Sequence, residues 1–156
     1  MLGRTYEDQV CSIARALEVV GERWSLLIVR DALLGVRRFD GFQKSLGIAR
    51  NVLADRLNRL VDEGVLERVL YEERPERFEY RLTEKGADLL PAMIALMHWG
   101  DRYLAGEAGP PRIPEHRGCG GDVVEQLACV ACEQILARED VTVRLGPALL
   151  AQPAGA

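Results

Sequence analysis

Two short segments near the C-terminal end contain the residue types that bind zinc. His116 and Cys119 are separated by two residues, and Cys129 and Cys132 repeat that spacing. Such pairs are typical of the two turns of a zinc ribbon, in which four protein ligands fill the coordination sphere of a structural ion. The sequence therefore predicts one structural zinc ion bound by these four residues. Free thiols, or a disulfide between Cys129 and Cys132, are the alternatives.

The surroundings of these pairs agree with a small module that depends on a metal. Gly120 directly follows Cys119 and suits a tight turn, whereas Glu133 stands in the corresponding place of the second pair. The segment has few large apolar residues, so burial alone cannot hold a fold there, and a metal would explain its order. The short strands that would complete the module are expected at 123–127 and 141–145.

A second group of residues has the charge needed to contact nucleic acid. The chain has a net charge of −4, yet the window from Arg37 to Leu60 contains six basic and two acidic residues, which gives it +4. For binding to a phosphate backbone, the distribution of charge matters more than its sum. Because charged runs are also common on solvated surfaces, the window becomes informative only together with a helical pattern.

A helix predicted from Arg50 to Glu63 has one apolar and one polar face. The residues that recur at helical spacing and are expected to face the core are Leu53, Leu57, Leu60 and Val61. The side chains that could read base edges from the opposite face are Asn51, Asp55, Asn58 and Arg59, with Arg50 at the N-terminal tip. Arg56 lies on the flank of the apolar face and is expected to form an ion pair within the scaffold.

Three further helices are predicted ahead of this one. Apolar residues recur at helical spacing over 10–20 and 24–34, with Gly21 and Gly35 at the ends. A third, short helix is expected to start near Phe39, where Asp40 and Gln43 could form a capping box, and to stop at Gly47.

After the polar helix the pattern changes to that of a β-hairpin. Val65 to Glu73 and Phe78 to Leu82 are rich in β-forming residues, and a charged turn containing Pro75 lies between them. One long helix is then expected from Thr83, its cap, to Leu104, with a kink at Pro91.

Two helices joined at a glycine, followed by a hairpin, have the order of a winged helix-turn-helix. In that fold the second helix enters the DNA major groove, and the hairpin forms a wing. The remaining candidates for DNA contact are Arg37, Arg38 and Lys44 ahead of that helix, and Arg74 and Arg77 at the wing tip.

Motifs from about Cys11 to Trp99 resemble the HxlR-type winged-helix regulators of bacteria and archaea. The opening signature runs from Cys11 to Arg30 and is followed by Gly35-Val-Arg-Arg-Phe39. The recognition helix, wing and next helix start resemble the family at Leu53-Ala-Asp-Arg-Leu57, Gly64-Val-Leu-Glu-Arg68, Pro75-Glu-Arg-Phe-Glu-Tyr80-Arg-Leu-Thr83 and Gly86. Ala49 and Arg50 depart from the family, which usually has a Ser or Thr cap here; losing that cap costs about 1 kcal/mol of helix stability.

The resemblance implies a homodimer formed by the first and last helices of the winged-helix domain. The apolar surface expected to form the dimer interface, or else to be buried within one chain, comprises Leu89, Leu90, Met93, Ile94, Met97 and Trp99.

In some family members a cysteine at the position of Cys11 senses oxidants or electrophiles. A helix start and Arg15, four residues on, could favour a thiolate there. A cysteine beside Val10 and Ala14 is also typical of a small core residue, and that interpretation is favoured.

The sequence therefore predicts an α+β, mainly α, winged helix-turn-helix protein with a small zinc-ribbon-like module. The expected divisions are a DNA-binding and dimerisation domain at 1–105, a linker at 106–115, the module at 116–147 and a flexible tail at 148–156. The expected function is that of a cytoplasmic regulator, whose dimer binds double-stranded DNA at a pseudo-palindromic operator and responds to redox signals or a small molecule. A winged-helix module that docks protein is the alternative. An enzyme is not expected, because the sequence contains only His98 and His116 as histidine bases and no nucleophile–base constellation.

Overall fold

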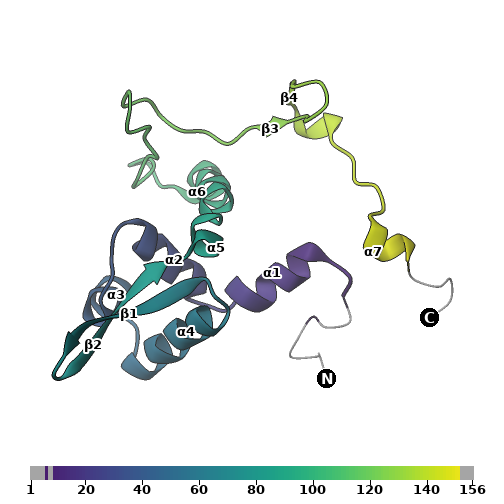
Figure 1. Ribbon diagram of the computed structural model, residues 1–156. Coiled ribbons are helices and arrows are strands. Elements are labelled where there is room, and N and C mark those ends of the chain that lie inside the picture. Colours follow the sequence, from purple (N-terminus) through teal and green to yellow (C-terminus); the bar gives the residue numbers. More distant parts are fainter. Residues whose placement is uncertain (1–5, 7–8, 152–156) are drawn as a thin grey trace. The chain divides into compact units, whose positions relative to one another are not determined.

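The computed structural model describes Tyr6 and residues 9–151 (Figure 1). Contacts within the chain divide it into two units, Met1–Met93 and Ile94–Ala156, and each unit is described by itself below. The polar N-terminal segment, for which no secretory signal is expected, lies mostly outside the described residues. Among the described residues, no helix combines the length and the apolar composition needed to span a membrane.

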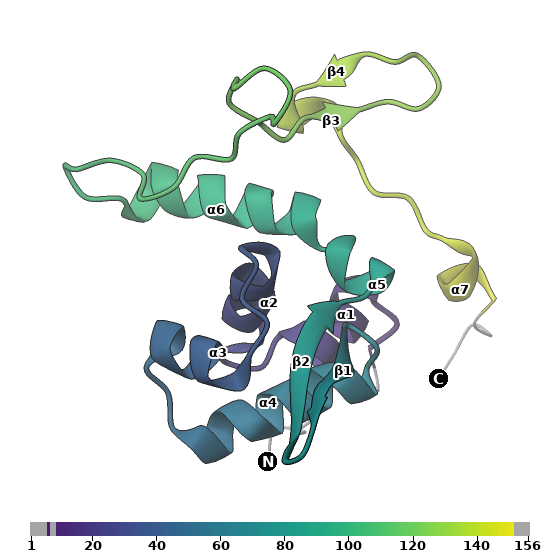
Figure 2. The same cartoon turned by 60° about the vertical axis from the view of Figure 1, so that its left-hand side comes forward.

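The first unit contains a cluster of short helices and one hairpin. Its elements are α1 (Ser12–Val20), α2 (Ser25–Leu33), α3 (Phe39–Leu46), α4 (Arg50–Asp62), β1 (Leu66–Glu73), β2 (Glu76–Leu82) and α5 (Glu84–Ala87). The predicted helices and hairpin are thus all present, with boundaries shifted by one or two residues. Figure 2 shows β1 and β2 as a twisted hairpin beside α4.

The core of this unit forms where α2, α3 and α4 meet the hairpin. The predicted apolar face of α4 is confirmed, because Leu53, Leu57 and Leu60 are fully buried, while Val61 is half-buried. Other fully buried side chains are Ile28, Val29, Phe42, Val65 and Leu66. Burial of such side chains is the main favourable contribution to folding, at about 2 kcal/mol for each large aliphatic group.

The turn between α3 and α4 depends on one glycine. Gly47 follows Leu46 with φ +64°, a left-handed conformation, and its N–H donates to the carbonyl of Gln43 at 2.9 Å. Glycine adopts this conformation without the steric penalty that a β-carbon brings, so it ends α3 and lets α4 start three residues later.

The capping box predicted at Asp40 and Gln43 is wrong. Arg38 is the residue at the N-cap of α3, and no side chain caps this end, because Asp40 lies inside the first turn. In that position its carboxylate can still interact favourably with the helix dipole. Ala49, the N-cap of α4, also makes no side-chain hydrogen bond, which agrees with the missing cap expected from the sequence.

The hairpin is anchored to the loop before α3. The pairing ends at Glu73 opposite Glu76, so Arg74 and Pro75 form the tip, and the register shifts between Leu70 and Glu72. The Tyr80 N–H donates to the carbonyl of Arg37 at 2.7 Å, and the Tyr80 ring meets Phe42 edge-on. These contacts fix the base of the wing against the core and leave its tip exposed.

The predicted single helix from Thr83 to Leu104 is wrong, because the structure has two helices. Thr83 caps α5, its hydroxyl accepting a hydrogen bond from the Gly86 N–H at 3.1 Å, and α5 ends at Ala87. The next helix, α6, spans Leu90–Leu104, and Pro91 lies in its first turn. Proline cannot donate the bond that a continuous helix requires at this point, but it is well tolerated in a first turn.

The second unit has little interior. It contains most of α6, the strands β3 (Leu127–Ala128) and β4 (Ile135–Leu136), a 3-10 turn (Arg138–Asp140) and α7 (Pro147–Leu150). The strands predicted at 123–127 and 141–145 are therefore misplaced: β3 and β4 directly flank the second cysteine pair. Part of the expected tail is the single-turn helix α7, and residues 152–156 lie outside the described residues. No residue from Ala87 to Ala151 is buried.

Candidate nucleic-acid interface

The exposed face of α4 presents uncharged and acidic hydrogen-bonding groups. Asn51, Asp55 and Asn58 are exposed and lie on the side opposite the buried leucines. Their spacing of four and then three residues places them on one face of the helix. Amide side chains can pair with adenine edges and a carboxylate can accept from cytosine, so this face has the chemistry of base readout.

Arg50 lies at the N-terminal end of that face. Its side chain is 73% exposed, and its guanidinium lies over the ring of Phe39 at 4.7 Å and 3.8 Å from the Asp40 carboxylate. Exposed ion pairs of this kind contribute little free energy, so the contact does not prevent Arg50 from binding a base or phosphate. The aromatic ring below the guanidinium limits the directions in which it can point.

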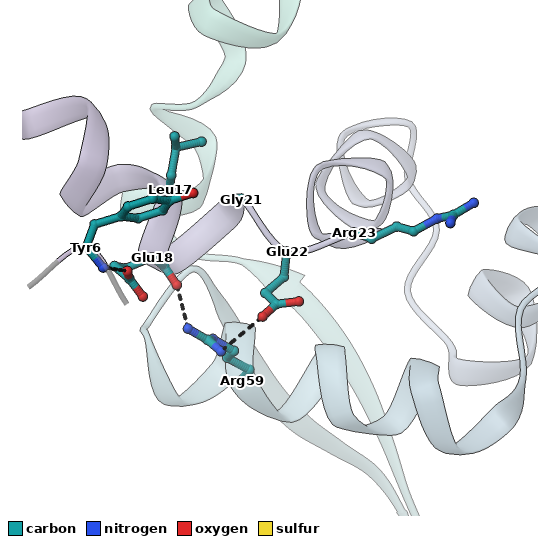
Figure 3. A pocket seen from close by; sticks show the side chains of 7 residues that line it. All are labelled: Tyr6, Leu17, Glu18, Gly21, Glu22, Arg23 and Arg59. Carbon is teal, nitrogen blue, oxygen red and sulfur yellow. Dashed lines mark hydrogen bonds and ion pairs between the residues drawn. The ribbon is translucent and has the colours of Figure 1, made fainter. Parts of the chain in front are cut away.

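Arg59, which the sequence predicts to read bases, is engaged within the protein, although its side chain stays 38% exposed. Its guanidinium donates to the backbone carbonyl of Glu18 at 2.6 Å and lies 3.8 Å from the Glu22 carboxylate (Figure 3). Both partners belong to the end of α1 and the turn after it. We therefore assign Arg59 to the scaffold, where it joins α4 to α1.

Arg37 and Arg56 are also engaged within the protein. Arg37 is half-buried, and its guanidinium donates to the carbonyl of Ala32 at 2.8 Å, near the C-terminal end of α2. Arg56 pairs with Glu22 at 2.9 Å and with Asp55 at 2.5 Å, which agrees with the ion pair expected from its position on the helix.

Glu22 is a residue that sequence reasoning missed. It pairs with both Arg56 and Arg59, which lie three residues apart on the same side of α4. The available signal was an acidic residue in a short turn, directly after Gly21, in a chain with two arginines at helical spacing. That signal indicates no partner by itself, because the residues are more than thirty positions apart.

Two basic residues near α3 remain available to phosphates. Lys44, in its last turn, is exposed. Arg38 is also exposed, lies over the ring of Tyr71 at 4.6 Å and stands 3.6 Å from the Glu79 carboxylate. The stacking of Arg38 on Tyr71 connects the start of α3 to the wing.

The wing tip is less basic than the two arginines alone suggest. Arg74 and Arg77 are exposed, but Arg77 lies 3.4 Å from the Glu72 carboxylate. The same stretch also contains Glu73 and Glu76. Acidic residues therefore outnumber basic ones in this loop, which reduces its attraction for phosphate.

Cys11 lies at the N-cap of α1. Its thiol is half-buried, and its carbonyl accepts a hydrogen bond from the Arg15 N–H at 3.1 Å.

At the other end of α1, a small pocket of about 240 Å³ is lined by Tyr6, Leu17, Glu18, Gly21, Glu22, Arg23 and Arg59 (Figure 3). Because Glu18, Glu22 and Arg59 already bond to groups of the protein, the pocket offers few free polar groups to a ligand.

The cysteine and histidine pairs of the second unit form locally. The Nδ1 atom of His116 lies 3.1 Å from the sulfur of Cys119. Backbone amides of Cys132 and Ala131, followed by the side chain of Cys132, hold the pKa of the Cys129 thiol below its ordinary value through hydrogen bonds. Across the part of the chain that the structure describes, no three His, Cys, Asp or Glu side chains gather closely enough to hold a metal.

The comparisons with known proteins concern both units. An HTH-type transcriptional regulator of Mycobacterium tuberculosis, Rv3095, is 48% identical over 141 residues, covering 90% of this chain and 89% of its own. The solved structure of PA1607, a candidate transcription factor, is 41% identical with a TM-score of 0.79 and covers 88% of this chain and 96% of its own. Matches of this length include most of the segment after α6.

A more distant relative matches a smaller part. The oxidised form of HypR, a redox regulator, is 28% identical with a TM-score of 0.56, and its entire length corresponds to 62% of this chain. The family model for HxlR-like helix-turn-helix proteins matches residues 19–108, the part that carries α2, α3, α4 and the wing. The chain belongs to the HxlR-like helix-turn-helix family of transcriptional regulators.

Proposed function

We propose that this protein is a homodimeric regulator that recognises a pseudo-palindromic operator through α4. The observation that carries the proposal is the exposed face of Asn51, Asp55 and Asn58, backed by buried leucines and preceded by the exposed Arg50. A helix that docked onto another protein would be expected to present an apolar face there. The polar face favours DNA over the alternative of a protein-interaction module.

The proposed contacts divide into base reading and phosphate binding. Asn51 and Asn58 offer amides to base edges, and Arg50 at the tip of α4 can bind a guanine or a phosphate. Arg38 and Lys44 supply positive charge beside α3, where the backbone of the duplex would pass. Arg74 and Arg77 contribute least, because glutamates surround them.

The proposed dimer rests on apolar side chains that the chain itself leaves uncovered. Ile13 on α1 is 71% exposed, and on α6 Leu96, Trp99 and Leu104 are 51%, 54% and 74% exposed. Exposed apolar area on this scale favours association. A two-fold dimer would present two copies of α4, so the operator half-sites should lie about one helical turn apart, roughly 34 Å.

Binding to promoter DNA tests the proposal. Purified protein should bind a segment of its own promoter more tightly than random duplex at physiological salt, and light scattering should give twice the chain mass. Asn51→Ala should reduce the preference about tenfold or more, as loss of a bidentate base contact does. Gln126→Ala removes the same amide from an exposed position in the second unit and should change nothing. Equal affinity for promoter and random DNA would instead favour a protein-docking module.

Redox control of this regulator is proposed through Cys11. The sequence favours a small core residue at Cys11, but the thiol is only half-buried at the N-cap of α1, and this exposure, together with the similarity to the redox regulator HypR, supports a sensing role. A mild oxidant should then release the operator, and Cys11→Ser should bind DNA normally but no longer respond. A response that persists in the serine variant would assign sensing to other thiols.

A further inference from the structure

The two Cys/His loops have one backbone pattern in common. In the first loop the Gly120 N–H donates to the carbonyl of His116 at 2.8 Å, and in the second the Glu133 N–H donates to the carbonyl of Cys129 at 2.8 Å. In each loop the donor is the residue that directly follows the second residue of the pair, and the acceptor is the carbonyl of the first residue of the pair. The two loops therefore turn back over the same number of residues.

The next hydrogen bonds repeat as well. The His116 N–H donates to the Gly121 carbonyl at 2.9 Å, and the Cys129 N–H donates to the Gln134 carbonyl at 3.0 Å. One step further out, a β-bridge joins Glu115 to Asp122, and the corresponding bridge joins Ala128 to Ile135. Each pair thus lies at the tip of a miniature hairpin, one of which is drawn as β3 and β4 in Figure 2.

The same position in each loop adopts a left-handed conformation. Gly120 has φ +73° and Glu133 has φ +60°. Glutamate adopts this conformation at a cost, because its β-carbon crowds the backbone, whereas glycine does not. Because the surrounding structure must impose this conformation on Glu133, the turn that carries Cys129 and Cys132 is fixed by the loop as a whole.

Groups around the sulfurs match this direction. The imidazole of His116 faces the sulfur of Cys119 at 3.1 Å. In the second loop the bond from the Glu133 N–H to the Cys129 carbonyl holds Cys129 and Cys132 at the tip of the same tight turn. Thiolates and neutral imidazole are the forms of these side chains that bind zinc. Both loops therefore present two donor atoms of the right kind at their tips.

We propose that His116, Cys119, Cys129 and Cys132 bind one structural zinc ion that joins the two loops. Neutral imidazole and three thiolates would surround the ion, and the three thiol protons would pass to solvent on binding. The described chain forms each pair but not the group of four, so binding requires the two loops to close on each other. All four positions belong to protein, so the site would stabilise the fold and not bind a substrate.

The metal would supply what burial does not. From Ala87 to Ala151 no residue is buried, and Val130, between Cys129 and Cys132, is fully exposed. A small module without a core commonly obtains its folding free energy from a metal. Because none of the four ligands lies in the first unit, the proposal is independent of the proposed DNA binding.

Elemental analysis of the full-length protein, purified without chelator under reducing conditions, tests the site. We expect one zinc per chain, and its loss in both Cys119→Ser and Cys129→Ser, because each loop supplies half the ligands. Cys11→Ser removes the cysteine outside the module and is the matched control, which should keep its zinc. Absence of stoichiometric zinc in the wild-type protein, or a disulfide between Cys129 and Cys132 in its place, would overturn the proposal.

Two further measurements separate loss of a ligand from loss of folding. His116→Cys preserves a donor atom and should retain one zinc per chain. Cobalt(II) in place of zinc should give the visible absorption of a tetrahedral site with thiolate ligands, changing in form between wild type and His116→Cys as one nitrogen is exchanged for sulfur. An identical cobalt spectrum in these two proteins, or zinc retained by both serine variants, would show that the ion binds elsewhere.

Discussion

The two units are held together by different physics. In the first, α2, α3, α4 and the hairpin contribute to a core in which Phe42, Leu53, Leu57 and Leu60 have no solvent exposure. In the second, Val130 and Val143 are almost completely exposed, and the described segment from Ala87 to Ala151 buries no residue. We therefore expect the first unit to fold on its own, and we expect the second to depend on the proposed zinc ion or on a partner chain. Changes to one unit should leave the other intact.

The largest effect is expected from Leu57→Ala in the core. Removing a fully buried leucine should lower the free energy of unfolding of the first unit by about 2–5 kcal/mol, because a cavity adds to the lost burial. Denaturant unfolding followed by circular dichroism measures this change. Val143→Ala, at a side chain 95% exposed, is the control and should shift stability by less than about 0.5 kcal/mol. Loss of bound zinc in Leu57→Ala would show that the units depend on each other.

Removing the proposed zinc ion should affect the second unit alone. With a strong chelator, limited proteolysis should cut within 116–147 at least tenfold faster, since a metal-dependent module loses its folding free energy. The unfolding transition of the first unit and its affinity for DNA should stay unchanged. Equal cleavage rates with and without chelator would mean that something other than a metal orders this segment.

Substitutions of Arg59 and Arg50 should separate the residues of α4 that stabilise the fold from those proposed to contact DNA. Arg59→Ala should lower stability by about 2 kcal/mol, because it removes a charged hydrogen bond to the Glu18 carbonyl. Arg50→Ala should leave stability within about 0.5 kcal/mol, since its contacts are exposed, but weaken operator binding about tenfold. The reverse pattern, with Arg59 affecting only DNA binding, would restore the role first expected for it.

The smallest effect concerns the two loop tips. Glu133→Gly should strengthen zinc binding by about 1 kcal/mol, or roughly fivefold, because glycine relieves the left-handed strain at φ +60°. Gly120→Ala should weaken it by a similar amount for the opposite reason. Competition with a chromophoric chelator measures both. Opposite signs for the two substitutions are required if the loops are equivalent halves of one site.

Local pattern predicted the elements of the first unit well. The spacing of Leu53, Leu57 and Leu60 identified the buried face of α4, and the charged, proline-containing turn located the wing tip, since both depend on neighbours in the sequence. The break between α5 and α6 was missed. The sequence predicts that Pro91 kinks a continuous helix, but in the structure a new helix begins at Leu90 and Pro91 lies in its first turn, where proline is well tolerated.

The direction of long side chains could not be predicted. Arg59 lies on the polar side of α4 by helical spacing, yet it reaches a carbonyl 41 positions earlier in the chain. The strands of the second unit were also misplaced, because β3 and β4 are only two residues long and follow the turns at Cys129 and Cys132, not a pattern of alternating apolar residues. Both results depend on tertiary geometry.

The bonds from α4 to the end of α1 have a mechanical consequence. Arg59 donates a hydrogen bond to the Glu18 carbonyl, and Arg56 forms an ion pair with Glu22 just beyond the helix. These two contacts connect α4 to the C-terminal end of α1. Cys11 lies at the far end of the same nine-residue helix. Under the proposed redox control, a displacement of α1 that begins at Cys11 would therefore reach α4, the proposed DNA-contacting helix, through these two side-chain contacts.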